Sequence, residues 1–247
     1  MVARRDILQT LDRWLTPENF QDYCPNGLQV EGRDQVRRIV SGVTASQALL
    51  DAAVKAGADM ILVHHGYFWK GEPQAVTGMK KARIKTLLTH DINLVAYHLP
   101  LDDHPEFGNN RRLADVLDIA NPRPLSGLLW EGELKEALSA EAFADYLAER
   151  LDRRPLHLGS GPDMIRRVAW CTGGAQGFLP QAVNAGVDAY ISGEASEPTT
   201  HTARECGIHY FGAGHHATER YGVQALGEAL AREFGLEHQF IDCDNPV

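Results

Sequence analysis

Hydrophobic positions along this chain follow two alternating patterns. Short, continuous apolar runs predict strands that are buried on both faces, and longer stretches with apolar residues three or four apart predict helices that bury one face. In the first part of the chain, these patterns predict strands at 39–43, 60–63 and 92–97 and helices at 6–15, 45–56 and 80–89. Strands and helices are therefore expected to alternate.

The same order of elements recurs near the other end of the chain. The patterns predict strands at 168–172, 189–192 and 208–211 and helices at 179–185, 199–205 and 219–234, and the first turn of the last helix would include His215 if it begins earlier. The segments AVKAGADMILVHHG and AVNAGVDAYISGEA match each other in a helix end, a glycine stop, an aspartate and a strand with polar residues at its exit. We interpret the chain as two α/β half-repeats.

Two half-repeats predict an α/β fold with two similar lobes, in which mainly parallel sheets are flanked by helices. Residues 1–104 and 217–247 are expected to form the first lobe, and residues 105–216 the second. The stretch between the repeats adds predicted helices at 110–116 and 141–151 and an edge strand at 156–158, and the tail adds a strand at 239–241. Ligands of parallel sheets gather beyond the carboxyl ends of the strands, so the cleft between the lobes is the expected position of a site.

Candidate metal ligands follow several of the predicted strands. His64 and His65 directly follow the strand at 60–63, and Asp102 follows the strand at 92–97 and a proline turn, with Asp103 as the weaker candidate beside it. His215 and Glu219 are four residues apart, so both side chains would lie on one helix face. Taken singly, each of these residues has an ordinary explanation. The histidines could belong to the core, the aspartates to a surface turn, and Glu219 could be a carboxylate that is stabilised by the helix dipole in the first turn.

Taken together, the candidates offer three imidazoles and two carboxylates. Such ligands bind zinc, iron, manganese or nickel. Five ligands are too few to fill the coordination shells of two ions, so positions would be left open. Open positions for water are typical of a catalytic site and are avoided in a structural one. His98 and Glu194 are the expected acid or base residues, with His98 the stronger candidate.

Composition limits the range of partners. A formal net charge of -9 and a pI near 5.6 disfavour a broad nucleic-acid-binding face, although a local basic groove is compatible with them. The four cysteines are scattered without a CxxC pair, which favours a reducing cytoplasm. The beginning of the chain lacks a continuous apolar segment, and no stretch has the length needed to span a bilayer. We therefore expect a cytoplasmic protein without membrane contact.

An aromatic and basic stretch follows the histidine pair. Tyr67, Phe68 and Trp69 precede Lys70, and further cations occupy the stretch from Lys80 to Lys85. These residues could stack a base and hold a phosphate. The alternative, which we slightly favour, is an aromatic cluster at a subunit contact beside a solvated basic helix.

Several segments resemble one known family. The segments are PNGLQVEG, SGVTASQALLDAAVKAGADMILVHHGYFWKG, HLPLD, SGE, HTARE and AGHHATERYGVQAL. Nearly the whole chain is similar to the Nif-three-like dinuclear-metal proteins, also called GTP cyclohydrolase I type 2 homologues. The resemblance implies two divalent metal ions per subunit, held by His64, His65, Asp102, His215 and Glu219, with Glu219 bridging the ions. The GHxxTE pattern selects His215 over His216.

The resemblance also implies a two-domain α/β subunit assembled into a ring-shaped homohexamer. The chain is of the short type, without the domain that longer relatives carry between the repeats. Our first hypothesis is a hydrolase in which a water made acidic by the ions attacks a purine nucleotide or a related phosphorylated or heterocyclic substrate. Phosphoester hydrolysis fits a two-metal site equally well. The alternative is a non-catalytic, metal-binding ring that acts as a scaffold or regulator.

Overall fold

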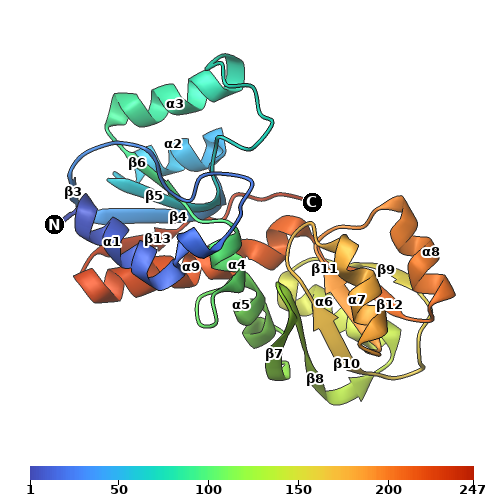
Figure 1. Ribbon diagram of the computed structural model, residues 1–247. Helices are drawn as coiled ribbons and strands as arrows, with labels where there is room; N and C mark the ends of the chain where they lie inside the picture. Colours follow the sequence, from blue (N-terminus) through green and yellow to red (C-terminus); the bar gives the residue numbers. More distant parts are fainter. The chain divides into compact units, whose positions relative to one another are not determined.

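The computed structural model describes residues 1–247 (Figure 1). Contacts divide the chain into two compact units, the first formed by residues 1–107 and 222–244, the second by residues 108–221 and 245–247. Helix α9 (His215–Phe234) begins in the second unit and ends in the first. No helix is long and apolar enough to cross a membrane.

The first unit contains a five-stranded sheet in the order β13-β4-β5-β6-β2. Four strands are parallel, namely β13 (Glu237–Phe240), β4 (Arg38–Thr44), β5 (Met60–His65) and β6 (Asn93–Ala96). Strand β2 (Gly27–Val30) pairs antiparallel with β6 at one edge, and β1 (Val2–Ala3) pairs with β3 (Gln35–Val36) in a separate small ribbon. The expectation of a mainly parallel sheet is confirmed here.

Helices cover both faces of this sheet (Figure 1). One face packs against α1 (Arg4–Leu15) and the later part of α9, and the other against α2 (Gln47–Lys55) and α3 (Gly78–His90). In β5, Met60 and Leu62 belong to the hydrophobic cluster on the α1 and α9 side, whereas Ile61 and Val63 belong to the cluster on the α2 and α3 side. Successive side chains of a strand point to opposite faces, so a strand covered on both sides needs a continuous apolar run.

The second unit contains a six-stranded sheet in the order β7-β8-β10-β11-β12-β9. Its centre is parallel and consists of β10 (Ile165–Trp170), β11 (Ala189–Ser192) and β12 (His209–Gly212). Antiparallel strands β8 (Leu129–Leu138) and β7 (Ala120–Ser126) extend one side, and β9 (Leu156–Gly159) extends the other. The predicted parallel repeat thus forms the centre of a mixed sheet.

The β7–β8 hairpin was not expected from the sequence. Asn121, Pro122 and Pro124 predict a turn, because proline cannot donate to a ladder, yet they lie in β7. Strand β7 is at the edge of the sheet, where a missing N–H is tolerated.

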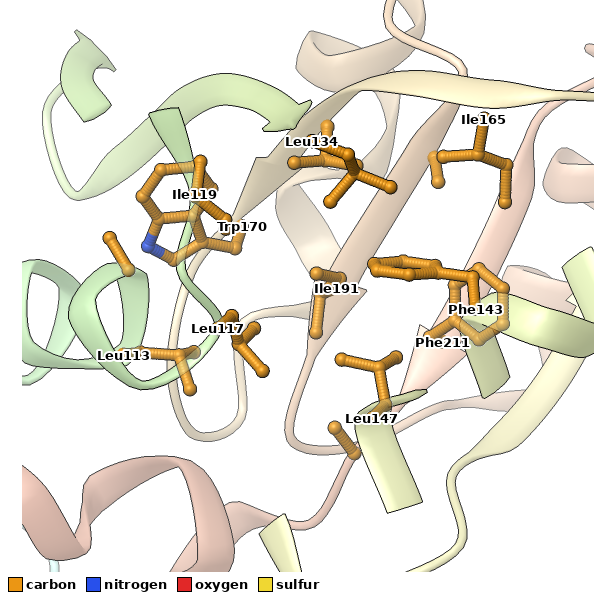
Figure 2. Close-up of a cluster of buried hydrophobic side chains, with 14 of the residues drawn as sticks. Leu113, Leu117, Ile119, Leu134, Phe143, Leu147, Ile165, Trp170, Ile191 and Phe211 are labelled. Carbon is orange, nitrogen blue, oxygen red and sulfur yellow. The ribbon is translucent and has the colours of Figure 1, made fainter. Parts of the chain in front are cut away.

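Helices also cover both faces of the second sheet. Helices α5 (Asn109–Val116) and α6 (Ala140–Leu151) pack on one face, and α7 (Leu179–Asn184) and α8 (Glu197–Glu205) pack on the other. Figure 2 shows the first of these cores, where Phe143 of α6 meets Phe211 of β12 edge to face, with ring centroids 5.1 Å apart. The chain is completed by α4 (Leu99–Asp103) and two 3-10 turns, Pro17–Asn19 and Gln176–Phe178.

The two sheets share a pair of hydrogen bonds from backbone N–H groups to an aspartate, as the sequence repeat suggests. The Asp59 carboxylate accepts hydrogen bonds from the backbone N–H groups of Arg37 and Arg38, and the Asp188 carboxylate accepts from those of Arg166 and Arg167. Each aspartate precedes one strand of a parallel pair and holds the start of its neighbour. The predicted glycine stops before these aspartates, Gly57 and Gly186, have φ of 69° and 66°.

Candidate metal centre

His64 is the last residue but one of β5, and its side chain is fully buried. Its Nδ1 lies 3.0 Å from the carbonyl oxygen of Tyr97, and its Nε2 lies 3.5 Å from Oδ1 of Asp102. Asp102 belongs to α4, which follows β6, the parallel neighbour of β5. Because the carboxyl ends of parallel neighbours meet at the same edge, residues far apart in sequence come together here.

His65, the next residue, is half-buried. Its Nδ1 lies 3.1 Å from Oγ1 of Thr44, the residue paired with it in strand register at the end of β4. The His64 and His65 rings lie 4.5 Å apart between centroids. The register of the sheet therefore provides the partner that orients the second imidazole.

A third imidazole in this unit comes from His98, the residue before α4. Potential ligand atoms of His64, His65 and His98 all lie within 4.8 Å of one another, so the three side chains could hold a metal ion. His98 Nδ1 donates to Oδ1 of Asp22 over 2.7 Å. His98 therefore lies beside the histidine pair, and its contact adds Asp22, a residue that the sequence did not single out.

Asp22 is held by its own loop. Its carboxylate accepts hydrogen bonds from the backbone N–H groups of Tyr23 and Leu99 and from the side-chain amide of Asn26. Burial raises the pKa of the Asp22 carboxyl, but the hydrogen bonds from His98 and Asn26 and the charge of His98 outweigh it and lower that pKa to about 2. The available sequence signal was the turn chemistry at Asn26, which indicates a turn but not its partner.

Cys24 is a further possible ligand, whose surroundings favour the protonated thiol. It forms a group with Asp22 and His98 that could hold a metal ion. Burial, followed by the charge of Asp22, raises the pKa of the Cys24 thiol to about 12. Metals bind the thiolate, so without a metal ion the surroundings of Cys24 favour the form that does not coordinate.

The second unit presents His215 and Glu219 on the first turns of α9. His215 Nε2 lies 3.2 Å from Oε2 of Glu219, whose side chain is only 3% exposed. Two glycines make room for this pair. A Cβ on Gly173 would overlap Oε1 of Glu219, and a Cβ on Gly193 would lie 2.6 Å from the His215 Cα. The turn at Gly173 and Gly174, which follows β10, therefore adjoins the candidate ligands.

Glu194 contacts the other side of the His215 ring. Its Oε1 accepts from Nδ1 of His215 over 2.7 Å. Burial lowers the pKa of His215, but hydrogen bonds and charge from Glu219 and then Glu194 raise it to about 9. An imidazole between two carboxylates favours a positive charge, and a bound cation would supply that charge in place of a proton.

Asp103, His201 and His216 have other surroundings. Burial raises the pKa of Asp103, with the nearby His104 acting in the opposite direction. His201 pairs with Glu197 on the exposed face of α8. His216 is buried, and its backbone N–H donates to the Val247 carbonyl.

Four imidazoles are anchored in the same way. In each ring, Nδ1 contacts an oxygen atom. The partner is a backbone carbonyl for His64, a hydroxyl for His65 and a carboxylate for both His98 and His215. Such contacts fix the tautomer and ring orientation of metal-ligating histidines, so Nε2 is the nitrogen that each ring presents for coordination or proton transfer. Together with the buried Asp102 and Glu219, these side chains have the nitrogen and oxygen chemistry that divalent transition metals require.

The fold and these groups define a class, that of α/β proteins whose parallel strands lead to imidazoles and carboxylates able to hold metal ions. The chain belongs to the Duf34/NIF3 (NGG1p interacting factor 3) family, whose model matches residues 2–246. This match confirms the resemblance seen in the sequence.

Relatives match over nearly their whole length. A Pseudomonas aeruginosa protein named "GTP cyclohydrolase 1 type 2 homolog" is 59% identical, with 100% of this chain and 99% of the relative covered. An Escherichia coli K12 protein of the same name is 52% identical, with 98% of each covered. The solved structure titled "protein ybgI, unknown function" has 51% identity and a TM-score of 0.97, and TTHA1606 from Thermus thermophilus has 34% identity and a TM-score of 0.93; both comparisons cover 100% of each chain.

Proposed function

We propose that this protein is a metal-dependent hydrolase that binds two divalent transition-metal ions per chain. The observation that carries the proposal is the common anchoring of the imidazoles through Nδ1, which prepares Nε2 for coordination. The room that Gly173 leaves beside Glu219 supports it. The proposed ligands are His64, His65, Asp102, His215 and Glu219.

Divalent ions in such a site supply Lewis acidity, which lowers the pKa of water and polarises a substrate oxygen. The chain's own residues then have separable tasks. His98, fixed by Asp22 through Nδ1, accepts or donates a proton at Nε2. Glu194 orients His215 through its other ring nitrogen, which makes it a positioning residue in this proposal.

The substrate class proposed is a nucleotide or a related phosphorylated or heterocyclic compound. The relatives' name "GTP cyclohydrolase 1 type 2 homolog" suggests hydrolysis of a purine nucleotide. A metal-dependent attack by water serves ring opening and phosphoester cleavage alike. Both reactions therefore belong in a substrate screen.

Self-assembly is a second part of the proposal. Phe68, Val76, Met79 and Leu88 are large apolar side chains that are 37–66% exposed, and they lie on α3 or before it. Exposed apolar groups that recur along one segment favour a protein contact, and a homo-oligomer, such as the hexamer implied by the resemblance, would bury them. Light scattering after size exclusion measures the assembly directly. A non-catalytic ring scaffold remains the competing function.

Metal content of untagged protein purified without chelator tests the hydrolase proposal. We expect about two transition-metal equivalents per wild-type chain and clear losses in Asp102→Ala and His215→Ala. Asp103→Ala and His201→Ala are matched controls that should keep the metal, because they change an adjacent aspartate and an exposed histidine. Wild-type protein that takes up no metal after reconstitution would contradict the proposal.

Turnover separates the enzyme from the scaffold. Metal-loaded protein is incubated with nucleotides and phosphoesters, and products are followed by chromatography. A hydrolase should lose turnover in His98→Ala while it keeps its metal and its fold. A loaded protein without turnover on the whole panel, whose His98→Ala variant loses assembly instead, would support the scaffold.

A further inference from the structure

Two loops of the first unit meet beside His98. The backbone N–H of Lys70 donates to the carbonyl of Tyr23 over 2.6 Å, which joins the loop after β5 to the loop before β2. The rings of Trp69 and Tyr23 both pack edge to face against the His98 ring. The interplanar angles are 83° and 63°, and the ring centroids are 5.0 and 6.4 Å from that of His98, respectively. Trp69 also lies 5.9 Å from His65. We call Tyr23 and Trp69 the aromatic rim.

The rim residues are positioned by the chain and are not simply packed into the core. The Trp69 indole N–H donates to the Gly66 carbonyl over 3.2 Å, and the Trp69 backbone N–H donates to the Glu72 carboxylate over 3.2 Å. With its only side-chain donor engaged, the indole offers a partner its π surface. Tyr23 is 61% exposed. A large aromatic ring left in solvent beside a candidate site is typical of a binding surface.

The backbone before Trp69 is held in an unfavourable conformation. Phe68 has a φ of 65°, a region that bulky residues rarely adopt. This kink separates three consecutive aromatic side chains. Tyr67 is buried and donates to the Ala45 carbonyl, Phe68 lies under Lys80 at 4.9 Å, and Trp69 packs against the histidines. Backbone strain of this kind concentrates at ligand-binding positions.

We propose that the aromatic rim binds a planar nitrogen heterocycle, such as a nucleobase, and places it beside His98. This inference rests on the proposed hydrolase function and deepens it, since it selects a heterocyclic substrate over a simple phosphoester. Aromatic side chains stack on the π face that every such ring has, whatever its substituents. Ring nitrogens and carbonyls of the heterocycle would then lie within reach of the His98 imidazole, which Asp22 holds in one orientation.

Calorimetric titration of metal-free, full-length protein with guanosine and with ribose 5-phosphate tests the rim. We expect guanosine to bind without metal and ribose 5-phosphate not to bind. Trp69→Leu and Tyr23→Leu should each weaken guanosine binding about tenfold or more, which corresponds to the loss of one stacking contact. Tyr23→Phe keeps the ring and should bind like wild type.

Phe68→Leu is the matched control in the same loop. Its ring lies beside Tyr67 and Lys80 and is not part of the aromatic rim, so guanosine binding should change less than about twofold. Thermal melts establish that each variant is folded. Equal binding of guanosine by wild type and both leucine variants, or ribose 5-phosphate binding as tight as guanosine, would overturn the inference. A changed oligomeric mass in Trp69→Leu with unchanged guanosine binding would also overturn it, because the rim would then be a subunit contact.

The failure of this inference can be told apart from the failure of the proposed function. Metal content decides the hydrolase proposal and does not involve the rim, so Trp69→Leu should carry as much metal as wild type. Guanosine binding is measured without metal and does not depend on the ligands. If the protein takes up metal but does not bind guanosine, only the inference about the aromatic rim is contradicted. If it binds guanosine but never takes up metal, only the hydrolase proposal is contradicted.

Discussion

Gly173 borders the Glu219 carboxylate so closely that a Cβ at position 173 would overlap Oε1 and would lie 3.1 Å from Nε2 of His215. Gly173 also has a φ of 68°. The absence of a side chain therefore serves both the turn after β10 and the placement of the two candidate ligands.

Gly173→Ala should reduce metal content as well as stability. Positive φ alone costs an alanine about 1–2 kcal/mol, and the overlap with Glu219 adds displacement of a ligand. We expect a variant that folds with a lowered melting temperature and takes up much less metal, as measured by plasma mass spectrometry.

Gly186→Ala is the control for this prediction. Gly186 has a φ of 66°, but an added Cβ there would meet no atom within 4 Å. It should lose similar stability and keep its metal. Equal metal loss in both variants would show that strain, and not the space beside Glu219, is responsible.

Asp22→Asn should change the tautomer of His98 without removing metal. In the wild type the Asp22 carboxylate accepts from Nδ1, so that nitrogen carries the proton. An amide in its place can accept or donate, and the two tautomers should then mix. Nitrogen-15 NMR of the His98 ring in metal-free protein reports the change. Partners of this kind typically alter activity 10–100-fold, roughly the loss expected once a substrate is known.

Asp12→Asn provides a comparison in the same unit. Asp12 accepts from the Tyr97 hydroxyl and does not contact His98. Its substitution should leave the His98 signals in place. If Asp22→Asn also leaves them in place, Asp22 does not control the orientation of His98.

Much of the fold and part of the site could be predicted from the sequence because the signals are local. The apolar run from Met60 to Val63 indicates a buried strand, and the glycine and aspartate before it, Gly57 and Asp59, recur as Gly186 and Asp188 before β11. Parallel topology then places His64 near Asp102 without further information.

The remaining features depend on contacts between distant residues. Asp22 meets His98 across 76 positions in the sequence, and nothing in either segment indicates the other. Gly173 lies beside Glu219, which is 46 positions later in the sequence. The two residues meet because the end of β10 lies next to the start of α9 in the second unit. The edge strand β7 was hidden by prolines that a solvent-facing edge tolerates.

Stability at low pH should depend on Asp22. Its carboxyl is 3% exposed, and its pKa of about 2 lies below the ordinary value of 3.8. A lowered pKa stabilises the folded state fully above about pH 4, and this contribution is lost as the pH falls towards 2. Urea unfolding of metal-free protein should therefore show Asp22→Asn to be about 2 kcal/mol less stable at pH 6 and close to wild type at pH 2. A difference that is constant with pH would assign the loss to packing.

Asp59 and Asp188 perform the same task in the two sheets, so their substitution by alanine tests whether burial sets the cost. Each removes the acceptor of two backbone N–H groups at a strand start. Asp59 is 9% exposed and also pairs with Arg33, whereas the Asp188 hydrogen bonds are exposed to water that can replace the carboxylate. We expect losses of about 2–3 kcal/mol for Asp59→Ala and about 1 kcal/mol for Asp188→Ala. Hydrogen exchange should quicken at the start of β4 in the first variant and of β10 in the second. Equal losses would mean that the hydrogen bonds matter irrespective of burial, and faster exchange outside the altered sheet would mean that these aspartates do not act locally.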